Sequence, residues 1–151
     1  MSNKLVYLAG AMGCYDHDDD YPYAWRRNAR EYFEKYSDYY GKNIEIFNPV
    51  NYYNYRCKNQ KTEREIMKFE FNRLKQCDVM LVNLKDLDKS IGTSDEILFA
   101  YLNHIPVIGF LEDETKLNNI HPWKHDEQID LIEVGEYALK SAIQYISEFY
   151  G

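Results

Sequence analysis

The strongest candidate for chemistry in this chain is a glutamate that closely follows a glycine-containing loop. Residues 90–96 read SIGTSDE, and they lie between an apolar run at residues 79–84 and a second apolar run at residues 97–102. This order predicts a strand, a loop and a helix with Glu96 in its first turn. Ligands bind at the carboxyl ends of strands in an open α/β sheet, so we expect this loop to border a binding site.

The expected position of Glu96 also bears on its charge. The positive end of a helix dipole favours an ionised carboxylate, and an ionised carboxylate held in place is the nucleophile that attack on a sugar carbon requires. A purely structural interpretation fits the same residues. Thr93 and Glu96 have the spacing of a capping box, in which Glu96 would only accept a backbone hydrogen bond.

A second acidic residue stands out because it interrupts an apolar stripe. Ile66, Glu70 and Leu74 are spaced at i, i+4 and i+8 and therefore share one face of a helix. Burial on that face would raise the pKa of Glu70, so that its carboxyl could hold a proton near neutral pH. Alternatively, Glu70 lies at the margin of the stripe and reaches solvent.

Alternating apolar and polar segments predict the elements that position these residues. Strands are expected at residues 4–9, 44–47, 79–84, 106–110 and 129–134, and helices at residues 22–40, 62–76, 94–103 and 135–150. Polar segments at residues 51–60 and 112–125 read as loops. The alternation predicts one domain over residues 1–151, a flavodoxin-like or Rossmann-like three-layer sandwich with a five-stranded parallel sheet in order 2-1-3-4-5.

The composition excludes several classes of protein. The 151 residues are 45% hydrophobic, which suffices for one domain with a core. A net charge of −7 argues against nucleic-acid binding, and no apolar run is long enough to span a membrane. Three cysteines without CxxC spacing indicate reduced thiols in a cytoplasmic compartment.

Motifs for cofactors and metals are missing or incomplete. The chain has no GxGxxG fingerprint and no Walker A loop. The acidic run at residues 16–20 lacks the glycine and the distal glutamate of a calcium loop. His121 and His125 have metal-like spacing, but Pro122 lies between them and no third ligand is evident. We therefore expect neither a cofactor nor a metal.

Several segments, taken in order, resemble the nucleoside 2-deoxyribosyltransferase superfamily, which includes deoxynucleoside 5′-monophosphate N-hydrolases. Residues 6–12 (VYLAGAM) resemble the first strand and loop of the family, often written YLAGP. Residues 25–26 (WR), 47–49 (FNP) and 77–82 (CDVMLV) resemble further landmarks. The pattern S-x-G-T-x-x-E-I-x-x-A at residues 90–100, followed by PVI at residues 106–108, resembles the signature that carries the nucleophile.

The resemblance implies a role for each matching residue. Glu96 would attack C1′ of the deoxyribose, Tyr7 would orient that carboxylate, and Glu70 would handle the leaving base. Asn118 matches a polar residue that a neighbouring subunit contributes, which implies a homodimer or larger homo-oligomer. Substrate-binding residues are expected at Gly10, Met12, Asn48, Ser90, Gly92 and Asn118.

Two departures from the family pattern leave the reaction open. The family aspartate is replaced by Glu70, and Ser90 stands where the transferases usually carry aspartate but the 5′-monophosphate N-hydrolases carry serine. The expected activity is sugar transfer from a nucleoside or nucleotide to another purine or pyrimidine base. The alternatives are an N-glycosidase that uses water, an NAD-type glycohydrolase, and a nucleotide-binding module without turnover. Fifteen tyrosines suit an interface between subunits.

Overall fold

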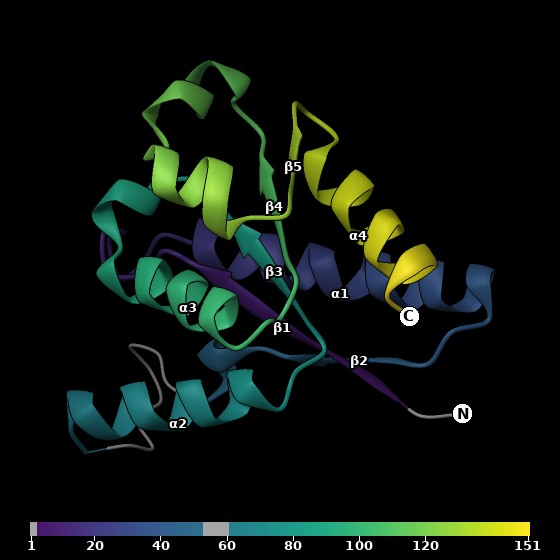
Figure 1. The fold of residues 1–151 in the computed structure, drawn as a ribbon, viewed down its shortest axis with the longest axis horizontal. Helices are drawn as coiled ribbons and strands as arrows, with labels where there is room; N and C mark the ends of the chain where they lie inside the picture. Colours follow the sequence, from purple (N-terminus) through teal and green to yellow (C-terminus); the bar gives the residue numbers. More distant parts are fainter. Residues whose placement is uncertain (1–2, 53–60) are drawn as a thin grey trace.

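The computed structural model describes residues 3–52 and 61–151, which contain one five-stranded sheet. The strand order is β2-β1-β3-β4-β5 and every neighbouring pair is parallel, as the sequence predicted (Figure 1). The strands are β1 (Lys4–Gly10), β2 (Ile44–Phe47), β3 (Val79–Asn83), β4 (Val107–Leu111) and β5 (Leu131–Val134). Most of the polar loop expected at residues 51–60 lies outside the described residues.

Helices cover both faces of the sheet. One face packs against α1 (Tyr21–Tyr40) and α4 (Ala138–Phe149), and the other against α2 (Glu63–Lys75) and α3 (Ile91–Leu102) (Figure 1). The connections contain shorter helical segments: η1 (Pro49–Asn51), η2 (Leu87–Lys89), η3 (Glu114–Asn119) and η4 (Trp123–Gln128). The polar segment expected to be a loop at residues 112–125 is therefore partly helical.

The interior strand β1 is buried on both faces. Its side chains alternate, so that Tyr7 and Ala9 pack in the layer under α2 and α3, whereas Val6 and Leu8 pack against α1 and α4. Coverage on both sides explains why the strand is almost continuously apolar. The same alternation directs the side chain of Tyr7 toward the helix that carries Glu96.

Local sequence signals set two helix ends as expected. Gly41 ends α1 in the left-handed conformation, with φ of 64°, which glycine adopts without a steric penalty. At the start of α2, the Thr62 hydroxyl oxygen accepts a hydrogen bond from the Glu65 amide at 3.1 Å. The Glu65 carboxylate in turn accepts from the Lys61 amide at 2.9 Å, one residue before the position that a standard capping box uses.

The start of α3 differs from the sequence prediction. The helix begins at Ile91 instead of residue 94, because the Ser90 side chain is its N-cap and accepts a hydrogen bond from the Thr93 amide at 3.3 Å. The predicted capping box between Thr93 and Glu96 does not form. Glu96 is consequently the sixth helical residue and lies in the second turn, where the helix dipole has little effect on its charge.

No helix within residues 3–52 and 61–151 is long and apolar enough to cross a membrane. In the same ranges, no group of three or more His, Cys, Asp or Glu side chains is placed to hold a metal ion. His125 contacts Asp126 at 2.7 Å, and His121 accepts a hydrogen bond from the Trp123 amide.

Candidate active site

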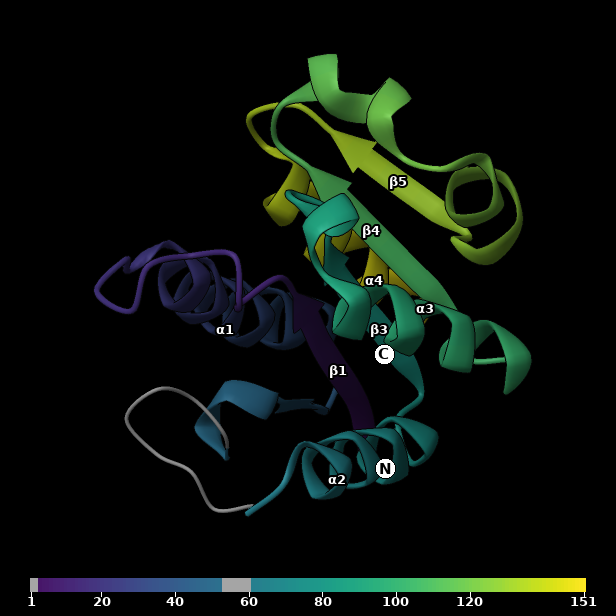
Figure 2. The same ribbon diagram turned by 90° about the vertical axis from the view of Figure 1, so that its left-hand side faces the viewer.

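A cleft of about 430 Å³ lies at the carboxyl end of β1. This is the point where the chain order of the sheet reverses, since β1 has β2 on one side and β3 on the other. Figure 2 shows the end of β1 between α1 and α3. Residues of the β1 end, α1, η1, α2 and the start of α3 line the cleft.

The innermost acidic group of the cleft is Glu96, whose exposed fraction is only 7%. Thr93, Glu96, Ile97 and Ala100 are the buried residues of α3, and their spacing defines the side of the helix that faces the sheet. The helical period therefore directs this carboxylate inward. Its Oε2 atom has no hydrogen-bond partner among the described residues, which is unusual for a buried polar atom.

Tyr7 lies beside Glu96 in the layer between β1 and α3. Its side chain is fully buried and stacks on Phe47 at a ring distance of 5.5 Å. The hydroxyl is close enough to lower the pKa of Glu96, yet it has no hydrogen-bond partner of good geometry within the described part of the chain. The Tyr7 hydroxyl and the Glu96 carboxyl are thus neighbours, but they are not oriented to form a hydrogen bond of good geometry.

Glu70 enters the same cleft from α2. Its side chain is half-buried, as its place on the stripe of Ile66 and Leu74 predicted. Burial raises the pKa of Glu70 above the usual carboxyl range, whereas the positive charge of Arg26 opposes this shift. Burial and the neighbouring charge of Glu70 raise the pKa of Glu96 as well. The end of α3 therefore does not decide the charge of Glu96, because burial and the nearby charge of Glu70 oppose its ionisation.

Arg26 also lines the cleft, although the sequence predicted no function for this arginine. Its exposed fraction is 3%, and its guanidinium donates to the carbonyl oxygens of Leu8, Gly10 and Pro22. A sequence signal for it exists. Pro22, Arg26, Ala29 and Phe33 recur at helical spacing on the buried side of α1, so a basic residue interrupts that stripe as Glu70 interrupts its own.

The sequence matches a known protein family over most of its length. A sequence profile described as nucleoside 2-deoxyribosyltransferase matches residues 6–135. The chain belongs to this family. No curated protein shows a significant sequence match to it.

Several solved structures share the fold of this nucleoside 2-deoxyribosyltransferase family member. The 2-deoxyribosyltransferase from Leishmania mexicana is 16% identical, with a TM-score of 0.65 over 98% of this chain and 99% of that one. The CMP N-glycosidase BcmB from Clostridium botulinum is 16% identical, with a TM-score of 0.61 over 94% of this chain and 99% of that one. The 2-deoxyribosyltransferase from Bacillus psychrosaccharolyticus is 14% identical, with a TM-score of 0.59 over 85% of this chain and 84% of that one.

The structure brings together most of the residues that the family resemblance singled out. Gly10, Met12, Ser90 and Gly92 line the cleft together with both glutamates. Gly10 fits closely there, because a Cβ atom at its position would lie 2.8 Å from the Trp25 ring.

Two of the expected binding residues lie outside the cleft. The Asn48 side chain accepts a hydrogen bond from Arg26 at 2.9 Å and does not line the cleft, so it holds the arginine in place. Asn118 is exposed on η3, away from the cleft of its own chain. A role for Asn118 in the site of another subunit stays a prediction.

Proposed function

We propose that the protein cleaves the N-glycosidic bond of a deoxynucleoside or nucleotide and passes the sugar to another base through a covalent glycosyl-Glu96 intermediate. The observation that carries the proposal is a buried carboxylate with an unpartnered oxygen, Glu96, in one cleft with Glu70 and Tyr7. Family membership supports it, as do fold neighbours described as 2-deoxyribosyltransferases and a CMP N-glycosidase.

The first step of the proposed reaction forms the glycosyl-enzyme. A carboxylate oxygen of Glu96 bonds to C1′ as the C1′–N bond breaks through an oxocarbenium-like state. The electron pair of that bond goes to the base nitrogen, and Glu70 supplies a proton to the departing base. Glu70 suits this role because burial raises its pKa to a range in which the carboxyl can hold a proton at neutral pH.

The second step returns the enzyme to its starting state. A nitrogen of an incoming base attacks C1′, the bond from C1′ to Glu96 breaks, and the Glu70 carboxylate accepts the proton that the new base releases. Water can replace the base as the acceptor, and the products are then the free sugar and the free base. Neither step needs a cofactor, since every proton moves between the reactants and Glu70.

A panel of substrates tests the function and separates the alternatives. The protein is incubated with deoxyinosine plus adenine, with dAMP, with dCMP and with NAD, and released bases and new nucleosides are measured by chromatography. Deoxyadenosine formed from the first mixture supports transfer, and free base without a new nucleoside supports hydrolysis. Nicotinamide release identifies a glycohydrolase of dinucleotides. Binding of a nucleotide without release of any base contradicts the proposed enzyme.

One observation favours the 5′-monophosphate N-glycosidase as the second candidate. The cleft wall at Ser90 carries no negative charge, and the first turn of α3 beside it offers backbone N–H groups to an anion. Lys89 also lines this wall. The Ser90 hydroxyl itself donates to the Thr93 hydroxyl at 2.8 Å, so the contribution of Ser90 to phosphate binding would be its lack of charge.

We therefore expect Ser90→Asp to lower kcat/KM for a deoxynucleoside 5′-monophosphate by roughly tenfold or more relative to the unphosphorylated nucleoside, because the carboxylate repels the phosphate. Ser90→Asn is the matched control, since asparagine and aspartate are both good N-caps but only aspartate is charged. Steady-state kinetics of both variants give the ratio. An unchanged ratio in Ser90→Asp would mean that the substrate phosphate does not bind at this wall of the cleft.

The outer surface of α3 supports a homo-oligomer. The helix is apolar on the face toward the sheet and on the opposite face, where Ile91, Leu98, Tyr101 and Leu102 are exposed. An exposed apolar helix face is typical of a contact surface. Ile91 is 81% exposed and also borders the cleft, so a second copy seated on α3 would lie against the site.

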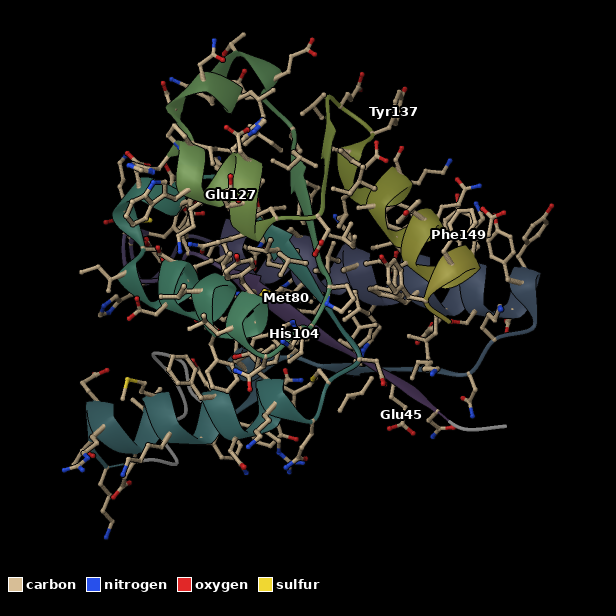
Figure 3. The ribbon with its side chains drawn as sticks, viewed as in Figure 1. Glu45, Met80, His104, Glu127, Tyr137 and Phe149 are labelled. Carbon is tan, nitrogen blue, oxygen red and sulfur yellow. The ribbon has the colours of Figure 1, made fainter. Side chains whose placement is uncertain are left out.

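We expect light scattering to show a dimer or larger assembly at micromolar concentration and Leu98→Glu/Leu102→Glu to shift it toward the monomer. The charges would be buried without partners in the contact, which is costly. Phe149→Glu is the control, because Phe149 is exposed at the far end of α4 and away from α3 (Figure 3). A wild-type monomer under these conditions, or an assembly that only the control disrupts, would contradict the proposal.

A further inference from the structure

Among the described residues, no negatively charged group contacts the buried guanidinium of Arg26 directly. It donates four hydrogen bonds, to the carbonyl oxygens of Pro22, Leu8 and Gly10 and to the side-chain oxygen of Asn48. All four acceptors are neutral, and Arg26 forms no ion pair within residues 3–52 and 61–151. These contacts fix the position of the charge without neutralising it, although a buried charge is costly unless it is compensated.

The hydrogen bonds hold Arg26 at the end of the sheet. β2 pairs with β1 only as far as Tyr7, and the two carbonyl groups that Arg26 binds, Leu8 and Gly10, follow on β1. The planar guanidinium spans both carbonyls because its N–H groups project as a rigid fork. The charge is therefore tied to the strand that forms the floor of the cleft.

The negative groups that compensate Arg26 lie in the cleft. Glu96 and Glu70 both line it with Arg26, and the positive charge lowers the pKa of each carboxyl against the effect of burial. Burial lowers the pKa of Arg26 to about 10, so the guanidinium stays charged at neutral pH. Tyr7 lies near all three of these side chains, and the other ionisable groups are Tyr23 near Arg26, Glu63 near Glu70 and Asp95 near Glu96.

We propose that Arg26 is a positioning residue that keeps the pair formed by Glu70 and Glu96 in a state with one proton at neutral pH. Without the guanidinium, the buried Glu96 and the half-buried Glu70 would both be protonated more readily. The reaction proposed above requires one proton on the pair, and this proton must lie on Glu70 when the ionised Glu96 attacks C1′. The catalytic consequence rests on that proposed function, whereas the effect on the protons of the pair does not.

Carboxyl ¹³C NMR titration tests the proposal without any substrate. The two signals are assigned from the spectra of Glu70→Gln and Glu96→Gln. We expect Arg26→Met to shift the midpoint of the first ionisation of the pair upward by roughly one pH unit or more. Arg26→Lys should keep this midpoint close to wild type, because the positive charge remains. Arg27→Met is the matched control on the same helix, since the Arg27 side chain is 61% exposed and pairs with Asp20 outside the cleft.

The possible outcomes separate this proposal from a purely structural role of Arg26. They also separate a failure of this proposal from a failure of the proposed activity. If Arg26→Met is folded by circular dichroism and the titration of the pair does not move, Arg26 only supports the strand and the proposal is wrong. If that variant does not fold, the wild-type spectrum decides, because a pair that holds no proton or two protons at pH 7.5 contradicts it. A shifted titration in a protein that releases no base would sustain this proposal and overturn the proposed function.

Discussion

Glu96→Gln is expected to lower the rate of base release by at least about 10³-fold, since glutamine cannot form the ester bond to C1′ on which the proposed reaction depends. Glu96 does not cap α3, because Ser90 fills that role, so the substitution leaves the helix start intact. Released base is measured by chromatography. Intact-protein mass spectrometry after rapid acid quench should show the glycosyl adduct in wild type and not in the variant.

Asp95→Asn is the control for this experiment. Asp95 is an exposed neighbour on the same helix and does not line the cleft, so it should retain most of the wild-type activity. If Glu96→Gln keeps more than about a tenth of the wild-type rate, Glu96 is not the nucleophile. If both variants lose activity equally, the helix and not the carboxylate at position 96 is what the reaction requires.

The second large effect concerns stability and pH. Burial raises the pKa of Glu96 and of Glu70 in the folded protein above their unfolded value, which is near 4.5. Above that value the folded state holds protons that the unfolded state releases, so the free energy of unfolding falls as pH rises. The stabilisation from these protons is complete below pH 4.5 and is lost as pH rises through the folded pKa values.

Glu96→Gln should therefore be more stable than wild type at pH 8 by about 1–3 kcal/mol, with the difference shrinking toward pH 4, because each pKa unit corresponds to about 1.4 kcal/mol. Urea unfolding at pH 4, 6 and 8 measures the difference. Glu136→Gln, at an exposed position, should show no such trend. An advantage of Glu96→Gln that is equal at all three pH values would mean that burial does not raise the pKa of this carboxyl.

The fold was predictable because its signals are local and repeated. Short, largely apolar segments predicted all five strands, and Gly41 and Thr62 mark helix ends through hydrogen bonds that involve only nearby residues. The start of α3 was not predicted, because Gly92 resembles a loop residue. The Ser90 N-cap overcomes the low helix propensity of this glycine.

The site was predictable only in part. Helical spacing indicated that Glu70 shares a face with apolar residues, and the structure places it in the cleft with Glu96. The contacts of Arg26 could not be read from the sequence, because its partners are backbone carbonyls at the end of a strand, and backbone groups carry no residue-specific signal. The sequence also gave no sign that the Asn48 side chain accepts a hydrogen bond from that arginine.

Few residues of the short helix α3 can be substituted freely. Its twelve residues include the N-terminal wall of the cleft, the inward-facing Glu96, two core contacts at Ile97 and Ala100, and an apolar outer face. Laboratory evolution of base or sugar preference is therefore better aimed at Met12 and Val50, which line the same cleft from outside α3. Changes there alter the shape of the site without disturbing the helix that carries the proposed nucleophile, part of the core and the proposed contact surface.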